Sequence, residues 1–235
     1  MRPLCGGLSQ GGPPVLTRPA GKPESAPHGE MSSGTPEIVV GLSGASGIQY
    51  GIRILQELSG RSKTHLIMTR SAREILSVET DWRPDEVEAL AFRSYNPEDF
   101  TAPFASGSYR VQGMVVAPCS MRTLAGIASG FSDTLITRAA DVCLKEHRRL
   151  VLVTREAPLN LIHLRNMVQV AEAGGVIMPA CPAFYGRPHS VEDLVDTVAG
   201  RALDLLGVKQ EIYRRWGGPA GMGKTYNDSD KDRSR

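Results

Sequence analysis

The chain has 235 residues, of which 41% are hydrophobic and 6% aromatic, and its formal net charge is +2. A chain of this length can form one good-sized core, and no stretch approaches the roughly 20 apolar residues of a membrane span. The small net charge and the few aromatic rings argue against nucleic-acid binding, which needs clustered cations and stacking surfaces.

The four cysteines lie far apart, at positions 5, 119, 143 and 181. They show no zinc-ligand spacing, and a disulfide framework is not typical of a chain this long. We therefore expect free thiols, a cytoplasmic protein and no bound metal.

Residues 1–35 are rich in glycine, proline and serine and show no periodicity, so they predict a disordered extension. They lack the apolar segment of a secretory signal. A folded domain is expected over 36–210, and the polar, glycine-containing stretch 211–235 is predicted to be a partly disordered C-terminal tail.

The domain opens with an apolar strand over 38–40, a glycine-rich turn over 41–47 and a helix over 48–58. The N–H groups and the dipole at a helix N-terminus favour an anion, so this turn is a candidate phosphate site. Its glycines match neither the dinucleotide-binding fingerprint nor the P-loop. A tight turn that binds nothing is the alternative.

The rest of the domain alternates short apolar runs with amphipathic segments. We predict strands at 64–68, 113–117, 150–153 and 176–178, and helices at 71–78, 83–92, 122–128, 135–146, 159–173 and from a capping box at 190–193 to about 206. Continuous apolar strands separated by helices are typical of a parallel sheet covered on both faces. The predicted fold is therefore a single doubly wound α/β domain of the Rossmann or flavodoxin-like class.

Polar or turn-forming residues follow every predicted strand. Open α/β sheets bind ligands outside the carboxyl ends of their strands, so we expect these segments to form one site. They are 41–47, 69–71, 118–123, 154–158 and 182–185.

Each candidate also has an ordinary structural explanation. Ser120 and Thr123 open a predicted helix and would cap it in any case. Arg155 and Glu156 would otherwise form a surface ion pair. Cys119 has no neighbouring histidine, which favours a buried thiol over a nucleophile. A solvated helix face or a rigid loop would equally explain Arg138, Lys145, Tyr185 and Arg187.

Motifs along the whole domain resemble the UbiX-type flavin prenyltransferases. They occur in order at 41–51, 103–108, 118–120, 137–146, 155–158 and 182–185. The resemblance implies transfer of a dimethylallyl group from dimethylallyl phosphate to N5 and C6 of reduced FMN, without a metal. It also implies a homo-oligomer, usually a dodecamer. The product, prenylated FMN, would serve a UbiD-type decarboxylase, in ubiquinone biosynthesis or in aromatic acid decarboxylation.

The same resemblance implies roles for individual residues. FMN would be bound by Gly44, Ala45, Ser46, Thr69, Ser120, Met121, Arg122, Thr123 and Arg155. Dimethylallyl phosphate would be bound by Ser106, Tyr185, Arg201 and Trp216. Catalytic roles would fall to Glu156, Lys145, Arg138 and Ser46. Positive donors would stabilise the leaving phosphate, and excluding water would protect the allyl cation.

Two other functions stay open. A flavin-dependent cysteine decarboxylase of the same superfamily would carry a different motif at 103–108 and a histidine on an early helix, and neither is found. A non-catalytic flavin carrier, or an accessory subunit of a decarboxylase, would need the FMN residues but no second phosphate site.

Overall fold

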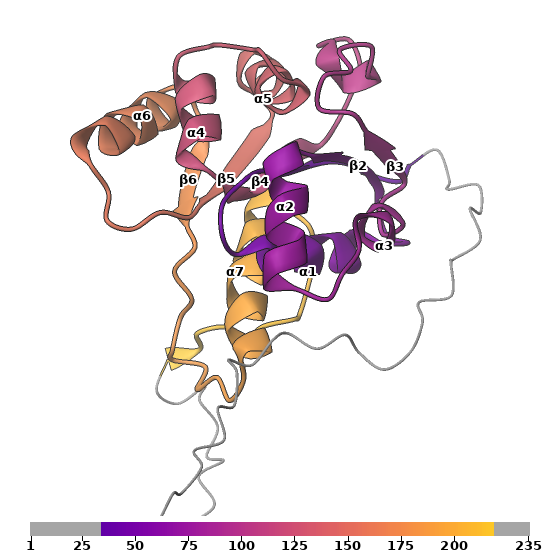
Figure 1. Cartoon of the computed structure of the whole chain (residues 1–235). Helices are drawn as coiled ribbons and strands as arrows, with labels where there is room; N and C mark the ends of the chain where they lie inside the picture. The colour runs from indigo at the N-terminus through magenta and orange to yellow at the C-terminus, as the bar shows by residue number, and fades with distance from the viewer. Residues whose placement is uncertain (1–33, 219–235) are drawn as a thin grey trace, which may run out of the picture.

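The computed structural model describes residues 34–218, and the predictions made for 1–33 and 219–235 lie outside this range. The strands are β1 (Glu37–Leu42), β2 (Lys63–Met68), β3 (Arg93–Tyr95), β4 (Gly113–Cys119), β5 (Arg149–Thr154) and β6 (Val176–Pro179). The helices are α1 (Ile48–Leu58), α2 (Arg70–Glu79), α3 (Pro84–Glu88), α4 (Met121–Ala128), α5 (Leu135–Lys145), α6 (Leu161–Glu172) and α7 (Val191–Leu206), with a 3-10 helix, η1, at Pro103–Ala105 (Figure 1).

The six strands form one sheet in the order β3-β2-β1-β4-β5-β6, and every neighbouring pair is parallel. This confirms the predicted doubly wound sheet. The chain builds the sheet outward from β1 in one direction and then resumes on the other side with β4. The boundary between β1 and β4 is thus the topological switch point, where sheets of this kind bind their ligands.

A hydrophobic core lies on each face of the sheet. Successive strand residues point to opposite faces, so Val40 packs in the cluster that holds the apolar residues of α1 and α7. Its neighbour Val39 belongs to the other cluster, with residues of α4, α5 and η1. Figure 1 shows α1 and α7 together on one side of the sheet and α4 and α5 on the other. No helix within 34–218 is long and apolar enough to cross a bilayer.

The prediction of one helix over 83–92 was wrong. The structure has the short helix α3, opened by Pro84, and then β3, whose Tyr95 pairs with Ile67 of β2. The strand was missed because three residues are too few to show an alternating pattern. The sheet consequently has six strands rather than the five predicted.

Candidate functional site

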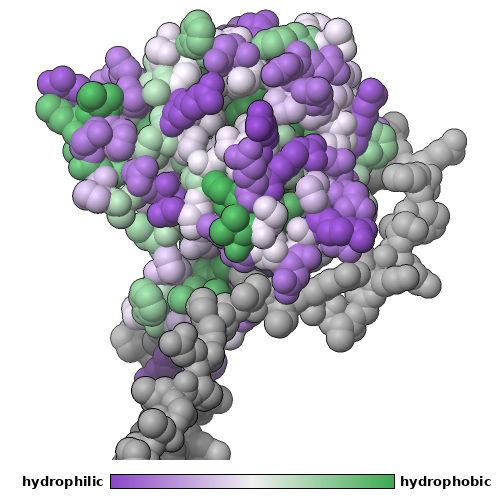
Figure 2. Space-filling view, in the orientation of Figure 1, coloured by the Kyte–Doolittle hydropathy of each residue, from purple (hydrophilic) through white to green (hydrophobic). Residues whose placement is uncertain are grey.

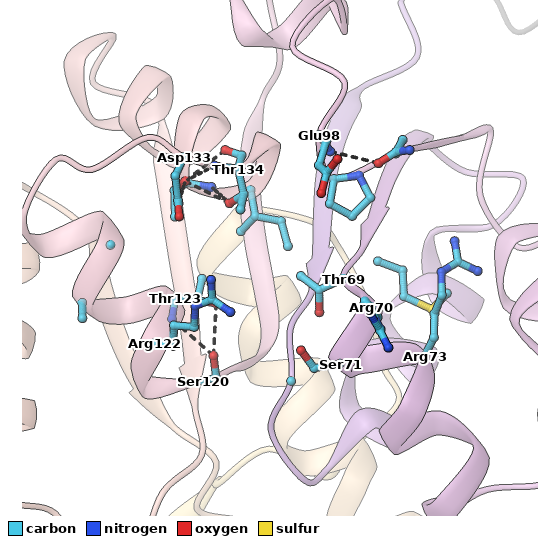
Figure 3. A pocket seen from close by; sticks show the side chains of 18 of the residues that line it. Thr69, Arg70, Ser71, Arg73, Glu98, Ser120, Arg122, Thr123, Asp133 and Thr134 are labelled. Atoms are coloured by element: carbon cyan, nitrogen blue, oxygen red, sulfur yellow. Dashed lines mark hydrogen bonds between the residues drawn. The ribbon is translucent and has the colours of Figure 1, made fainter.

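A pocket of about 1140 Å³ opens at the carboxyl edge of the sheet beside the switch point (Figure 3). Its volume is slightly above the roughly 300–1,000 Å³ typical of ligand sites. The residues that follow β1, β2, β4 and β5 all contribute to its wall. Among them are Gly44, Thr69, Arg70, Ser71, Arg73, Ser120, Met121, Arg122, Thr123, Asp133, Thr134 and Glu156.

The fifth predicted segment, 182–185, does not line this pocket. It follows β6, which is an edge strand of the sheet and lies two positions from β4, the strand at the switch point. The chain after β6 leads away from the sheet toward the start of α7 (Figure 1). The expectation that all five strand ends meet therefore holds for four of them.

Two helices begin at the pocket. Thr69 caps α2, and its Oγ1 accepts the N–H of Ala72 at 3.1 Å. Ser120 caps α4, and its Oγ accepts the N–H of Thr123 at 3.2 Å. Ser120 therefore caps a helix and lines the pocket, so the two sequence-based interpretations of this residue do not exclude each other. The cap at Thr69 was not among the sequence-based expectations.

Three arginines share this wall with the two helix N-termini. Arg70 and Arg73 belong to α2, and Arg122 belongs to α4 (Figure 3). Guanidinium groups, hydroxyls and helix N-termini are the groups that bind phosphate in proteins. The pocket therefore suits a ligand that carries a phosphate.

The glycine-rich turn forms part of the same wall. A Cβ on Gly44 would collide with the side chain of Ser71, so only glycine lets the turn approach α2 this closely. The buried Ser43 hydroxyl donates to the carbonyl of Pro118 and accepts the N–H of Ser120, both at 2.8 Å. These bonds join the exits of β1 and β4 across the switch point.

The N-terminus of α1 already holds an anion. The Glu79 carboxylate, at the end of α2, accepts the N–H of Gly47 at 2.8 Å and that of Ile48 at 3.3 Å. The expectation that these donors are free for a ligand phosphate is therefore corrected. Glu79 was missed because no motif relates it to a turn some 30 residues earlier.

Arg155 and Ser46 meet next to the pocket. The Arg155 Nε donates to the carbonyl oxygen of Ser46 at 3.1 Å, which ties the exit of β5 to the glycine-rich turn. Neither residue lines the pocket, and neither does Ala45. Glu156 does, and its Oε1 accepts the N–H of Ala157 at 3.1 Å. None of the ion pairs found in residues 34–218 includes Glu156.

A second group of predicted residues gathers around η1. Arg138 donates from Nε to the carbonyl of Ala105 at 3.0 Å and pairs through Nη1 with Asp141 at 2.9 Å. Lys145 pairs with Glu146 at 2.5 Å. Ser106 lies in the loop after η1, and none of these three predicted residues lines the pocket.

A third group lies beside α7. The rings of Tyr185 and Trp216 meet edge to face, with centroids 5.5 Å apart. Arg201, on α7, pairs with Asp204 at 3.5 Å. This group also contributes nothing to the pocket wall. The fold of one chain thus places the predicted site residues in three separate groups.

Cys119 lies at the end of β4, close to the pocket, and is fully buried. Burial raises the pKa of its thiol to about 12. It is therefore a neutral thiol near pH 7, which supports the structural interpretation over the nucleophile.

A family model described as Flavoprotein matches residues 25–203. The chain is 48% identical over 182 residues to the flavin prenyltransferase UbiX of Methanothermobacter thermautotrophicus, which covers 77% of this chain and 95% of that protein. Among solved structures, AnUbiX (PadA1) in complex with FMN and dimethylallyl pyrophosphate is similar, with a TM-score of 0.77, 51% identity, and coverage of 78% of this chain and 98% of that one. A dodecameric FMN-dependent UbiX-like decarboxylase from Escherichia coli O157:H7 has a TM-score of 0.76 and 46% identity, and covers 77% of this chain and 100% of that one.

Proposed function

The chain belongs to the UbiX family of flavin prenyltransferases, and we propose that it acts through a site that more than one copy of it completes. The reaction joins the dimethylallyl group of dimethylallyl phosphate to N5 and C6 of FMN, which enters as a reduced substrate. The observation that carries this function is the pocket at the switch point, found in a chain 51% identical to a protein whose structure holds both FMN and a dimethylallyl donor.

The residues of the pocket fit FMN. The hydroxyls of Thr69, Ser120 and Thr123, with the nearby arginines, supply donors for the phosphate. The glycine at position 44 leaves the wall free of a side chain where the turn approaches α2. We assign the remaining flavin contacts to Ala45, Ser46, Met121, Arg122 and Arg155.

The donor site is the part that needs a second copy. Tyr185, Arg201 and Trp216 gather beside α7, whereas Arg138 and Lys145 gather at η1, and none of them reaches the pocket of its own chain. A neighbouring subunit that brings these groups to the flavin would supply the cations and the aromatic cover for a leaving phosphate.

The surface of α6 supports assembly. Four of its large apolar side chains are exposed, and Figure 2 shows hydrophobic residues gathered over this helix at the left of the view. Exposed apolar patches of this kind mark interaction sites. The residues are Leu161, Ile162, Leu164 and Val168. We propose that a second copy of the chain covers them, in an assembly of the dodecameric kind.

Within the pocket, Glu156 is our candidate for proton transfer. It is the pocket carboxylate that follows β5, and no ion pair among the described residues neutralises it. Bond formation at C6 of the flavin requires loss of a proton, which a carboxylate within reach can accept. Arg138 and Lys145 would act on the phosphate that leaves.

Anaerobic incubation of the purified protein with reduced FMN and dimethylallyl phosphate tests the function. Formation of prenylated FMN, seen by mass and absorbance and absent when the donor is omitted, is the expected result. A flavin carrier would bind FMN without making product, and a cysteine decarboxylase would release carbon dioxide from a cysteinyl peptide instead.

Two finer predictions accompany this function. We propose that a UbiD-type decarboxylase receives the product, which activation of such an apoenzyme by the reaction mixture would test. We also propose a cytoplasmic location, supported by the unpaired cysteines at 119, 143 and 181. Imaging of a tagged chain would test that prediction.

A further inference from the structure

The carboxylate of Asp204, near the end of α7, gathers three residues of the segment that follows the helix. Its Oδ1 accepts from Gln210 Nε2 at 2.9 Å and from Arg215 Nη2 at 2.7 Å. Its Oδ2 accepts from Tyr213 Oη at 2.7 Å and from Arg215 Nη1 at 2.8 Å. The arginine therefore binds both oxygens, the strongest geometry of such a pair.

These bonds determine the path of the segment 208–216. No helix or strand spans these residues, and after the backbone bond from Val208 to Leu203 the hydrogen bonds that join the segment to α7 come from side chains. Gln210 also donates to the carbonyl of Gly200 at 3.2 Å and accepts the N–H of Ile212 at 2.9 Å. A Cβ on Gly200 would collide with the ring of Tyr213, so the segment lies directly against α7.

Asp204 also contacts Arg201 of the donor-binding group directly, and it reaches Trp216 of that group through the neighbouring Arg215. Its Oδ2 lies 3.5 Å from Nη1 of Arg201, one turn earlier on α7. Its partner Arg215 immediately precedes Trp216, whose ring packs against Tyr185. One carboxylate thus connects the guanidinium expected to bind phosphate with the aromatic ring expected to cover the donor.

We propose that Asp204 is a positioning residue, which holds Arg201 and the Trp216 segment in the arrangement that receives dimethylallyl phosphate. This inference rests on the proposed function, because that function gives Arg201 and Trp216 their roles. Groups that are already ordered bind a ligand with a smaller entropic cost, and misplacement of about 1 Å can cost up to about 100-fold in rate.

The charge of Asp204 is maintained across the physiological range. Burial raises the pKa of this carboxyl, but the hydrogen bonds from Arg215, Tyr213 and Gln210 prevail and hold the pKa at about 2. The Asp204 carboxylate is therefore fully ionised near pH 7. A neutral amide at this position removes the charge that strengthens the hydrogen bonds from Arg215 and Tyr213.

The test is Asp204→Asn, which keeps the shape of the side chain and removes its charge. We expect unchanged affinity for FMN, and a KM for dimethylallyl phosphate raised by about 10- to 100-fold. The matched control is Asp196→Asn, on the same helix, which loses an ion pair to Arg53 but has no bond to 208–216. The control should keep the KM of the parent protein.

A second readout follows the segment directly. The chain has two tryptophans, at 82 and 216, so Trp82→Phe leaves Trp216 as the sole indole. In this background Asp204→Asn should shift the emission to the red and increase quenching by acrylamide. Tyr213→Phe removes one hydrogen-bond donor to Asp204, so it should produce a smaller red shift and a smaller increase in quenching. This variant replaces Asp204→Asn in the test if Asp204→Asn does not fold.

A variant with the parent KM for dimethylallyl phosphate and the parent Trp216 emission would overturn the inference. A parent protein that makes no prenylated FMN would instead contradict the proposed function. In that case the fluorescence measurement still decides whether Asp204 holds the segment.

Discussion

Glu79 closes the N-terminus of α1 by accepting the N–H of Gly47, with 2.8 Å between nitrogen and Oε2. Gly47 has a φ of 94°, in the left-handed region that glycine adopts without strain. The contact joins the end of α2 to the start of α1, and a further bond, from the Gln49 amide to the Glu79 carbonyl at 3.3 Å, strengthens the junction. These bonds tie the glycine-rich turn to the end of α2.

Glu79→Gln should loosen this junction. The amide keeps one acceptor but loses the charge that interacts with the helix dipole, a contribution of about 0.3–1 kcal/mol to the free energy of unfolding. We expect that loss in urea titrations, together with weaker binding of FMN. Glu57→Gln, at the other end of α1, is the control and should leave FMN affinity unchanged. Equal affinity in Glu79→Gln and the parent would show that the turn does not depend on this carboxylate.

His65 is buried in β2, among groups that the proposed reaction does not use. Its Nε2 lies 3.0 Å from Oε2 of Glu37, and its Nδ1 lies 3.1 Å from the hydroxyl of Tyr95. Tyr109 donates its hydroxyl to the same Glu37 oxygen. Burial lowers the pKa of His65 and outweighs the opposite effect of Glu37.

Stability should therefore fall as the solution becomes acidic. The pKa of His65 is lower in the folded protein than in the unfolded chain, where it is about 6.5, so below that pH the unfolded chain binds more protons. Burial raises the pKa of Glu37, but hydrogen bonds from Tyr109 and His65 bring it below its usual value. The two groups thus act in the same direction.

Urea titrations at pH 7.5 and pH 5 measure this effect. His65→Gln keeps a polar side chain but cannot titrate, so the fall in stability between the two pH values should shrink. The basic side chains that act on the ring, those of Lys63 and Arg93, are the same in the parent and the variant, so the comparison isolates the imidazole. An identical fall in the parent and the variant would assign the pH dependence to other groups.

The sequence predicts those parts of the fold that repeat a local pattern. The caps at Ser120 and Ser190 and the buried strands follow from residue types and spacing alone. The order in which strands alternate with helices indicates the doubly wound sheet. The three-residue strand β3 could not be predicted, because its existence depends on pairing with β2.

The candidate site could be predicted from the sequence only in part, for a related reason. Residues at strand ends were expected together, and Gly44, Thr69, Ser120 and Glu156 do share the pocket wall. The contact of Glu79 with the N-terminus of α1 depends on the tertiary structure, and no sequence spacing predicts it. Residues such as Arg201, which do not line the pocket of their own chain, can be assigned to the site only by resemblance.

Assembly should depend on the exposed face of α6. Ile162→Glu places a charge in the centre of that face, and burying it against a second copy would be costly. We expect smaller particles in light scattering, an unchanged circular dichroism spectrum and reduced formation of prenylated FMN. Val78→Glu, at an even more exposed apolar position on α2, is the control. A fully active monomer would contradict the composite site.

Glu156 provides the sharpest test of the chemistry. Its Oε1 accepts the N–H of Ala157, and the amide oxygen of a glutamine can make the same bond. Glu156→Gln should therefore fold and bind FMN normally, but it has no group that accepts a proton near neutral pH. A general base typically contributes roughly 10²–10⁴-fold. Because the leaving phosphate can also accept the proton, we expect a loss at the lower end of this range, which is about 100-fold slower formation of prenylated FMN.

Anaerobic mixing with reduced FMN and dimethylallyl phosphate, followed by mass spectrometry, measures the rate of this reaction. Glu172→Gln, at an exposed position on α6, is the control. Product formation at the parent rate would leave Glu156 without a role in proton transfer.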